Sequence, residues 1–381
     1  MSSLIYLDYA ATTPMDPVVA EVLAAHLTID GCFANPASRS HMLGWQAEAA
    51  VEKARKQVAE LIGADTREIV WTSGATEANN LAIKGYLAQF NQVGGHIITS
   101  ATEHKAVLDC FEFMAHNGFK VSYVAPDNMG RVTPALVEPL ICEDTRLLSV
   151  MHVNNETGVI NDIAGLAELA RSRGLVFHVD AAQSVGKLAI DLAKTPIDLL
   201  SMCAHKIYGP KGIGALYVRR REGLSVAPLI HGGGHERGMR SGTLATHQIA
   251  AMGESFAIAG ALMEAEQAKM AQFRADFLAE LTGDSRITIN GDQVCCVPGI
   301  VNFAVSGVDG QLLMSALPQL AISSGSACTS ASMSASHVLT AMGVSEEMAL
   351  GALRVSFGRF SSAKELSEAA RSIKDVLARI S

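Results

Sequence analysis

The chain has 381 residues, of which 49% are hydrophobic and 18% charged, and its net charge is −8. This length is too great for one small core, so we expect two domains, or one large domain with a smaller one attached. The negative charge argues against a general nucleic-acid-binding protein. No apolar run is long enough to span a bilayer, and the N-terminus lacks the basic and apolar regions of a signal peptide.

The seven cysteines lie at positions 32, 110, 142, 203, 295, 296 and 328, and no two have the CxxC spacing. An odd number without metal-binding spacing favours reduced thiols over a disulfide framework or a zinc site. We therefore expect a cytoplasmic protein without a metal site.

From about residue 68 to 218, short apolar runs alternate with helical patterns. Continuous apolar strands between amphipathic helices are typical of a parallel sheet that is covered on both faces. Predicted strands lie at 68–72, 96–100, 146–153, 174–180 and 197–203, and the run at 212–220 is expected to form an edge strand. Predicted helices follow the first two strands, at 74–90 and 104–116.

After about residue 258 the pattern changes to long helices and short strands. The predicted order is a helix at 260–283, strands at 286–290 and 299–305, a helix at 311–320, a strand at 353–357 and a last helix that Ser362 and Glu365 begin as a capping box. This indicates a smaller α+β domain, which the N-terminal segment joins. We expect a large domain over 15–258 and a small domain made of 1–14 and 259–381.

Lys206 lies in "AHKIYGPKG", after a predicted buried strand and before a Gly-Pro turn. A lysine in a half-buried loop loses solvation, so its amine becomes the nucleophile that Schiff-base chemistry needs. On this stretch alone, a lysine whose ammonium reaches solvent is the more common explanation.

Asp180 ends the predicted strand in "HVDAAQ". A buried acid needs a cationic partner, and a protonated pyridine nitrogen would serve. Gln183, three residues later, could bond the phenolic oxygen of the same ring. The alternative for Asp180 is a helix N-cap.

Three further stretches also follow predicted strands. Gly74, Ala75 and Thr76 form a turn that leads into a helix, where backbone N–H groups could bind a phosphate. His104 begins the next helix and could stack on a ring and move protons, although an ordinary capping histidine fits equally well. Asn155 could reach a substrate with its amide. Because ligands gather at the carboxyl ends of strands in open α/β sheets, these stretches are predicted to meet in one site.

A lysine, an aspartate and a phosphate cradle on such a sheet indicate pyridoxal phosphate binding. The chain also closely resembles cysteine desulfurases of the NifS/IscS branch between about residues 4 and 375. The resemblance rests on long, ordered stretches: "LDYAATTP", "ANPASRSH", "TSGATEANNLAIKG", "TEHKAVL", "MHVNNETG", "HVDAAQSVGK", "HKIYGPKGIGALY", "HGGGHERGMRSGT" and "SSGSACTSAS". It implies the α/β fold type I of pyridoxal phosphate-dependent transferases, similar to aspartate aminotransferase, with a mainly parallel sheet in a homodimer.

The resemblance also implies roles for single residues. Lys206 would carry pyridoxal 5'-phosphate and remove the Cα proton of L-cysteine, and His104 would stack on the ring and take part in proton transfer. Asp180 would pair with the pyridinium and Gln183 with the phenolic oxygen. The phosphate would be held by the turn at Gly74 and Ala75 and by Thr76, Cys203, His205 and Thr243 of the partner subunit. The substrate carboxylate would be bound by Asn155 and Arg354, with Asn35 close by.

Cys328 lies in the serine-rich stretch "SSGSACTSAS", which has no apolar periodicity. By resemblance, its thiolate attacks the sulfur of the substrate, leaving L-alanine and a persulfide on Cys328. The persulfide would pass to acceptor proteins, either an iron–sulfur scaffold or a thiolation relay, and Cys328 could transiently contact iron–sulfur species. No stable nucleic-acid or membrane partner is implied. The acceptor is left open between iron–sulfur assembly, tRNA thiolation and DNA phosphorothioation, with iron–sulfur assembly the most common role.

The chain departs from many relatives at three places. Cys203 replaces a serine that bonds the phosphate, "SMSASH" replaces a Glu-Pro sequence, and the sequence stops at Ser381, where IscS-type relatives carry a scaffold-docking tail. Two other enzymes remain as alternatives, a selenocysteine lyase and a class V aminotransferase. A non-catalytic sulfur carrier is a third alternative, and it would be expected to lack Lys206.

Overall fold

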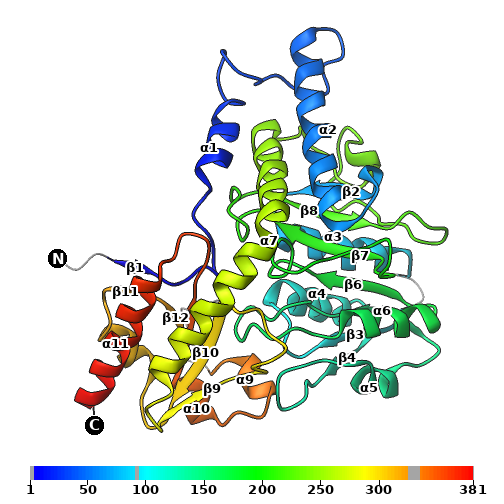
Figure 1. Cartoon of the computed structure of the whole chain (residues 1–381). Coiled ribbons are helices and arrows are strands. Elements are labelled where there is room, and N and C mark those ends of the chain that lie inside the picture. The colour runs from blue at the N-terminus through cyan, green and yellow to red at the C-terminus, as the bar shows by residue number, and fades with distance from the viewer. Residues whose placement is uncertain (1–3, 91–93, 325–334, 381) are drawn as a thin grey trace.

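The computed structural model describes residues 4–90, 94–324 and 335–380. Its largest sheet has seven strands in the order β2-β8-β7-β6-β5-β3-β4 (Figure 1). The strands are β2 (Ile69–Thr72), β3 (Gly95–Ser100), β4 (Phe119–Val124), β5 (Thr145–Ser149), β6 (Val176–Asp180), β7 (Leu199–Cys203) and β8 (Gly214–Val218). All neighbours pair in parallel except the two pairs that β8 makes. The predicted mainly parallel sheet is confirmed.

The position of β8 corrects one prediction. The run at 212–220 was expected at the sheet edge, but β8 lies between β2 and β7. All five of its residues are buried, and Arg219 and Arg220, the last two residues of the predicted run, follow the strand at its end. The edges are β2 and β4, and β4 was missed because most of its residues are partly exposed and form no continuous apolar run.

Helices cover both faces of this sheet. Side chains of one face, such as Trp71, Phe177 and Leu200, pack in one core with α2 (Met42–Ile62), α6 (Ile163–Ser172) and α7 (Thr246–Leu281). Their strand neighbours point the opposite way and pack against α3 (Ala75–Leu87) and α4 (Lys105–His116). This alternation follows from the two-residue period of a strand. Most side chains on both faces are therefore buried and apolar, and the buried polar exceptions include His178 and Ser201 in the middle of β6 and β7.

Helix α7 is longer than the sequence predicts. It begins at Thr246 rather than near residue 260. Its first turns are apolar on most sides and buried, so they give no amphipathic signal. Figure 1 shows α7 running from beside α2 to the second sheet. Because the helix passes through residue 258 without a break, the two parts of the chain share it, and the domain boundary at 258 stays a prediction.

The second sheet is antiparallel, with the order β12-β13-β10-β9. Its strands are β9 (Ile287–Ile289), β10 (Ile300–Val305), β12 (Ser323–Ser324) and β13 (Ala352–Ser356). The N-terminal strand β1 (Ile5–Tyr6) pairs with β11 (Leu320–Ala321) next to it, and Asp8 bridges to Ser356 of β13. The assignment of the N-terminal segment to a small domain stays a prediction.

In the described part of the chain, three short helices and one longer helix accompany the second sheet. The short ones are α8 (Gly310–Ser315), α9 (His337–Ala341) and α10 (Glu346–Leu350), and the longer one is α11 (Ala363–Ile380). The capping box before α11 is confirmed, since the Ser362 N–H donates to the Glu365 carboxylate and the Glu365 N–H donates to the Ser362 hydroxyl. The helix predicted over 311–320 stops at Ser315, shortly before Pro318. Two small helices complete the chain, α1 (Pro17–Ala24) and α5 (Pro134–Val137).

None of the helices in the described ranges combines the length and the apolar character that crossing a membrane requires.

Candidate active site

A cleft of about 520 Å³ opens at the carboxyl ends of the parallel strands. β2, β3, β5, β6 and β7 each end in a segment that lines it. Most of the predicted site residues meet there: Gly74, Ala75, Thr76, His104, Asn155, Asp180, Gln183, Cys203, His205, Lys206 and Arg354. The expectation that these separate stretches meet at one edge of the sheet is therefore confirmed.

Asp180 is the acid of this cleft. It is the last residue of β6 and only 5% exposed. Its Oδ2 accepts a 2.8 Å hydrogen bond from Asn79 Nδ2, and its Oδ1 accepts one of 2.9 Å from the N–H of Ala182. No cationic side chain of the described residues forms an ion pair with it. A buried carboxylate without a cation is costly, so this oxygen pair is suited to a cationic N–H from a ligand.

The start of α3 forms an anion site on the same cleft. Gly74 is the N-cap residue, with φ of 155°, and no side chain caps the helix. A Cβ atom at Gly74 would meet nothing within 4 Å, so the space beside the first N–H groups is open. These free N–H groups and the positive end of the helix dipole favour a phosphate.

Two histidines line the cleft as neutral rings. His104 caps α4, and its Nδ1 accepts a hydrogen bond from the N–H of Ala106, so the ring proton is on Nε2. Burial, together with the charge of Lys206, lowers the pKa of His104. The same two causes lower the pKa of His205 to about 4. Both rings can therefore bond or stack without adding a positive charge at neutral pH.

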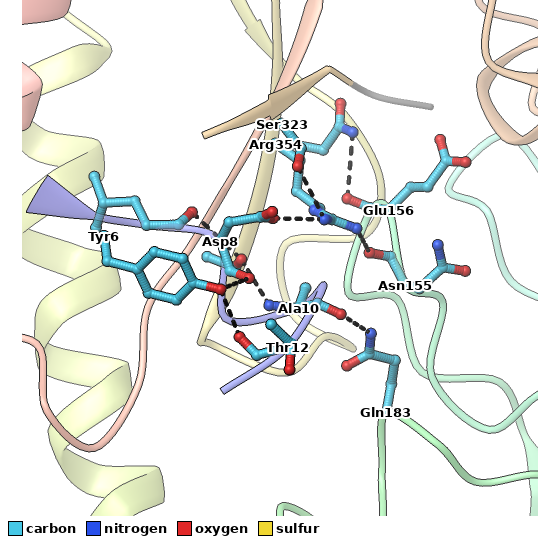
Figure 2. A network of polar contacts seen from close by, with 12 residues as sticks. Tyr6, Asp8, Ala10, Thr12, Asn155, Glu156, Gln183, Ser323 and Arg354 are labelled. Carbon is cyan, nitrogen blue, oxygen red and sulfur yellow. Dashed lines mark hydrogen bonds and ion pairs between the residues drawn. The ribbon is translucent and has the colours of Figure 1, made fainter. Parts of the chain in front are cut away.

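Arg354 reaches the cleft from β13, and its side chain is 1% exposed. Its Nη1 donates to the backbone oxygen of Asn155 over 2.8 Å, and its Nη2 donates to Asp8 Oδ1 over 2.7 Å (Figure 2). Its Nε is buried and has no hydrogen-bond partner among the described residues. The guanidinium thus joins the N-terminal segment, the loop after β5 and the second sheet.

Cys203 is the last residue of β7, and Lys206 follows it three residues later. Lys206 is partly exposed to the cleft, and its amine forms no ion pair within the described part of the chain. Cys203 is 1% exposed, and burial raises the pKa of its thiol to about 11. Cys203 is therefore a protonated thiol at neutral pH, which can pack in the site and act as a weak hydrogen-bond donor.

Three predicted site residues are not in this cleft. Thr243 lines a separate pocket with Ser73 and Arg240. Asn35 is exposed, and its Oδ1 accepts a hydrogen bond from the N–H of Ala37. Cys328 lies outside the described residues.

Sequence reasoning missed several polar residues that support the site. Asn79 on α3 is fully buried and holds Asp180, Asp8 holds Arg354, and Glu77 pairs with Arg240 at 2.8 Å. Asn79 could have been found, because it lies on the apolar face of an otherwise amphipathic helix. Asp8 could not, because its partner is 346 positions away in the sequence.

The cleft residues fit pyridoxal 5'-phosphate. Asp180 offers a carboxylate to a ring N–H, the start of α3 offers N–H groups to a phosphate, and Lys206 offers a free amine to an aldehyde. In the described residues, no group of three or more His, Cys, Asp or Glu side chains could hold a metal ion.

Comparisons with known proteins agree with this chemistry. The model of the family Aminotransferase class-V matches residues 5–368. The cysteine desulfurase IscS of Pseudomonas aeruginosa is 55% identical over 376 residues, which cover 99% of this chain and 93% of that protein. IscS of Pseudomonas putida is 54% identical over the same length.

Solved structures give the same match in three dimensions. A NifS-like protein superposes with a TM-score of 0.91 at 33% identity, covering 98% of this chain and 99% of that one. A structure described as SspA in complex with cysteine has a TM-score of 0.83 at 37% identity and covers 94% of this chain and 99% of its own.

Proposed function

Because the chain belongs to the class-V aminotransferase family, and within it to the cysteine desulfurases of the NifS/IscS type, we propose the residues by which it takes sulfur from L-cysteine. The enzyme depends on pyridoxal 5'-phosphate, as its family does. When bound, this cofactor supplies an aldehyde for the substrate amine and a ring that withdraws electrons from Cα. The remaining chemistry is done by side chains.

Lys206 holds the cofactor and serves as the base at Cα. Its amine lines the cleft without an ion pair in the described residues, so it is available both as a nucleophile and as a proton acceptor. Asp180 keeps the ring nitrogen protonated, and Asn79 fixes the carboxylate. His104 stacks on the ring and, being neutral, can take or give a proton.

Arg354 and Asn155 bind the carboxylate of L-cysteine, whereas Asn35 lies outside the cleft of its own chain. Arg354 already has two of its nitrogens held by Asp8 and the backbone of Asn155. A fixed guanidinium binds a carboxylate with less loss of side-chain entropy than a free one. The carboxylate end of the substrate is thereby held in one place in the cleft.

Cys328 is the sulfur acceptor. Its thiolate attacks the substrate sulfur, a new S–S bond forms, and the Cβ–S bond breaks with its electron pair going to carbon. Protonation of Cβ and return of a proton from Lys206 to Cα give L-alanine, and the persulfide on Cys328 passes to an acceptor protein. We propose iron–sulfur cluster assembly as the main destination, with thiolation of tRNA or other nucleic acid as the second.

The enzyme works as a homodimer. Near α1 and the start of α2, which project beyond the rest of the chain (Figure 1), large apolar side chains are exposed, including Ile29, Leu43 and Trp45 at 78%, 43% and 55%. Exposed apolar groups gathered in one region are typical of an interface. Thr243 lies outside the cleft of its own chain, which fits a role at the phosphate of the other subunit.

The six cysteines of the described residues are all free, as expected of a cytoplasmic protein.

The observation that carries this proposal is the convergence of Lys206, Asp180 and Arg354 on one cleft in a chain of this family. The test is to supply L-cysteine and an excess of a thiol reductant, which releases the persulfide sulfur as sulfide, to the cofactor-loaded protein and to measure L-alanine and sulfide. Equal amounts of both, lost in Lys206→Ala, are expected. Alanine production that persists in Lys206→Ala would overturn the assigned base. A protein that binds no cofactor would instead revive the sulfur-carrier alternative, and release of selenide with no action on cysteine would favour a selenocysteine lyase.

A further inference from the structure

A second lysine, Lys187, lies directly behind the cleft. It belongs to the turns that follow β6, and its Nζ donates a 2.9 Å hydrogen bond to Oε1 of Gln183. Gln183 is 3% exposed and lines the cleft. Its Nε2 donates a 2.8 Å hydrogen bond to the backbone oxygen of Ala10 (Figure 2).

These two contacts determine the positions of Oε1 and Nε2 in the Gln183 amide. The Lys187 amine donates to Oε1, and the Ala10 carbonyl can only accept from Nε2. If the amide were turned over, its nitrogen would face an ammonium and its oxygen would face a carbonyl. The N–H of Nε2 that remains is therefore a donor, and Gln183 can offer it to an anionic oxygen in the cleft.

The described surroundings of the Lys187 amine contain little that would compensate its charge. Its amine makes no ion pair with any described residue, and burial together with Lys206 lowers its pKa to about 7. The other charged or titratable groups around it are Cys203, Arg354 and Glu266. Glu266, the only carboxylate among them, is already paired with Arg359. An amine held in such a place without a counter-ion is unfavourable unless a nearby negative group compensates it.

The backbone of Lys187 is also held in place. Its carbonyl oxygen accepts a hydrogen bond from Gln267 Nε2 on α7. Residues of this turn and of α7 also line a cavity of about 60 Å³, and Lys187 and Lys206 both lie on its wall. The Lys187 amine is thus directed at Gln183 from a fixed base.

We propose that Lys187 is a positioning residue that locks the Gln183 amide with its N–H toward the phenolic oxygen of pyridoxal 5'-phosphate and adds a positive charge behind it. This inference rests on the proposed function, because it takes the cofactor to sit in the cleft. Both effects stabilise the ionised phenolic oxygen, so they favour the deprotonated form of the bound cofactor.

The test is the pH dependence of the absorption spectrum of the full-length enzyme loaded with pyridoxal 5'-phosphate, recorded for wild type, Lys187→Met and Lys187→Arg. In Lys187→Met the midpoint of the spectral transition is expected to rise by about one pH unit. Lys187→Arg keeps a cationic donor and is expected to restore most of the wild-type midpoint. The matched control is Lys194→Met, which removes an exposed lysine of the neighbouring loop and should leave the midpoint unchanged.

A merely structural role would lower the melting temperature of Lys187→Met without moving the midpoint, and that result would overturn the inference. Lys187→Gln, which keeps a shorter donor, is measured in parallel in case Lys187→Met does not fold, and its midpoint is expected to rise as well. Measurements on the wild-type protein distinguish a failure of the proposed function from a failure of the role proposed for Lys187. If wild type binds no cofactor and makes no alanine, the proposed function fails; if it does both and the midpoint of the folded variant is unchanged, only the role of Lys187 fails.

Discussion

Asp8 and Arg354 form an ion pair with 2.7 Å between Oδ1 and Nη2, although 346 positions separate them in the chain. The pair ties the N-terminal segment to β13, and the side chain of Arg354 is 1% exposed. A buried guanidinium that is held by a fixed carboxylate keeps its remaining N–H groups in one orientation. The geometry of the candidate substrate site therefore depends on residues at both ends of the sequence.

Replacing Arg354 with lysine should impair the binding of L-cysteine. An ammonium cannot contact Asp8, the Asn155 carbonyl and a substrate carboxylate with the geometry of a planar guanidinium. We expect the KM for L-cysteine to rise about tenfold or more and the cofactor spectrum to stay as in wild type. Steady-state kinetics provide the measurement, with Arg371→Lys on the exposed face of α11 as the control. An unchanged KM would remove Arg354 from the substrate site.

Replacing Asp180 with asparagine should weaken cofactor binding. A neutral amide cannot stabilise a protonated ring nitrogen, and a hydrogen bond to a charged group contributes about 2 kcal/mol, or roughly 30-fold in affinity. Titration of the cofactor-free protein with pyridoxal 5'-phosphate gives the dissociation constant. Asp198→Asn is the matched control, because Asp198 is also a buried acid of this sheet but pairs with Arg221 away from the cleft. Equal affinity in wild type and Asp180→Asn would contradict the role of Asp180.

Glu156 should make stability depend on pH. It is buried and accepts a hydrogen bond from Ser336, and burial raises its pKa to about 7. In the unfolded chain the carboxyl loses its proton near its ordinary pKa of about 4.5, so between there and about 7 the folded state binds more protons than the unfolded state. The contribution of Glu156 to stability is therefore complete below pH 4.5 and is lost as the pH rises to about 7.

The measurement is the melting temperature of wild type and Glu156→Gln between pH 5 and 8. The amide keeps a hydrogen-bonding group but does not ionise, so the variant should gain stability relative to wild type as the pH rises. Other buried groups titrate in both proteins and cancel in the difference. A difference that does not change with pH would show that the raised pKa of Glu156 is wrong.

Introducing a charge at Trp45 should separate the subunits. Trp45 lies in the first turn of α2 and is 55% exposed among other apolar side chains. Burying a glutamate at an apolar interface is costly, so Trp45→Glu is expected to be monomeric by light scattering. If Thr243 acts at the cofactor of the other subunit, the monomer should also bind pyridoxal 5'-phosphate more weakly. Phe113→Glu, at a similarly exposed aromatic residue on α4, serves as the control. A dimeric Trp45→Glu would place the interface elsewhere.

The sequence predicts those parts of the fold in which the apolar pattern repeats or ends sharply. Continuous apolar runs locate β3, β5, β6 and β7, and polar residues directly after them locate Asp180, His104 and Asn155. It does not predict the order of strands, because the position of β8 between β2 and β7 depends on contacts that no local pattern records. It also fails for the first half of α7, where burial on most sides removes the periodicity.

The supporting residues of the site are the hardest to predict. Asp8 contributes through a partner 346 positions away, and Lys187 lies behind the cleft residue that it holds. Neither has a composition or spacing that sets it apart, whereas Asn79 could have been found by its place on the apolar face of α3. Residues that touch the cleft are found by their place at the ends of strands, whereas most residues that hold them in place become visible only in three dimensions.

The central claim is that sulfur leaves L-cysteine by way of Cys328 in a cleft where Lys206 does the proton chemistry. The most direct measurement is single-turnover mass spectrometry of the loaded enzyme mixed with L-cysteine, for wild type and Cys328→Ala. We expect wild type to gain one sulfur atom on Cys328 and release one L-alanine, and Cys328→Ala to keep its cofactor spectrum but form neither product. If Cys328→Ala releases L-alanine and sulfide as fast as wild type, the sulfur takes another route and the account is wrong.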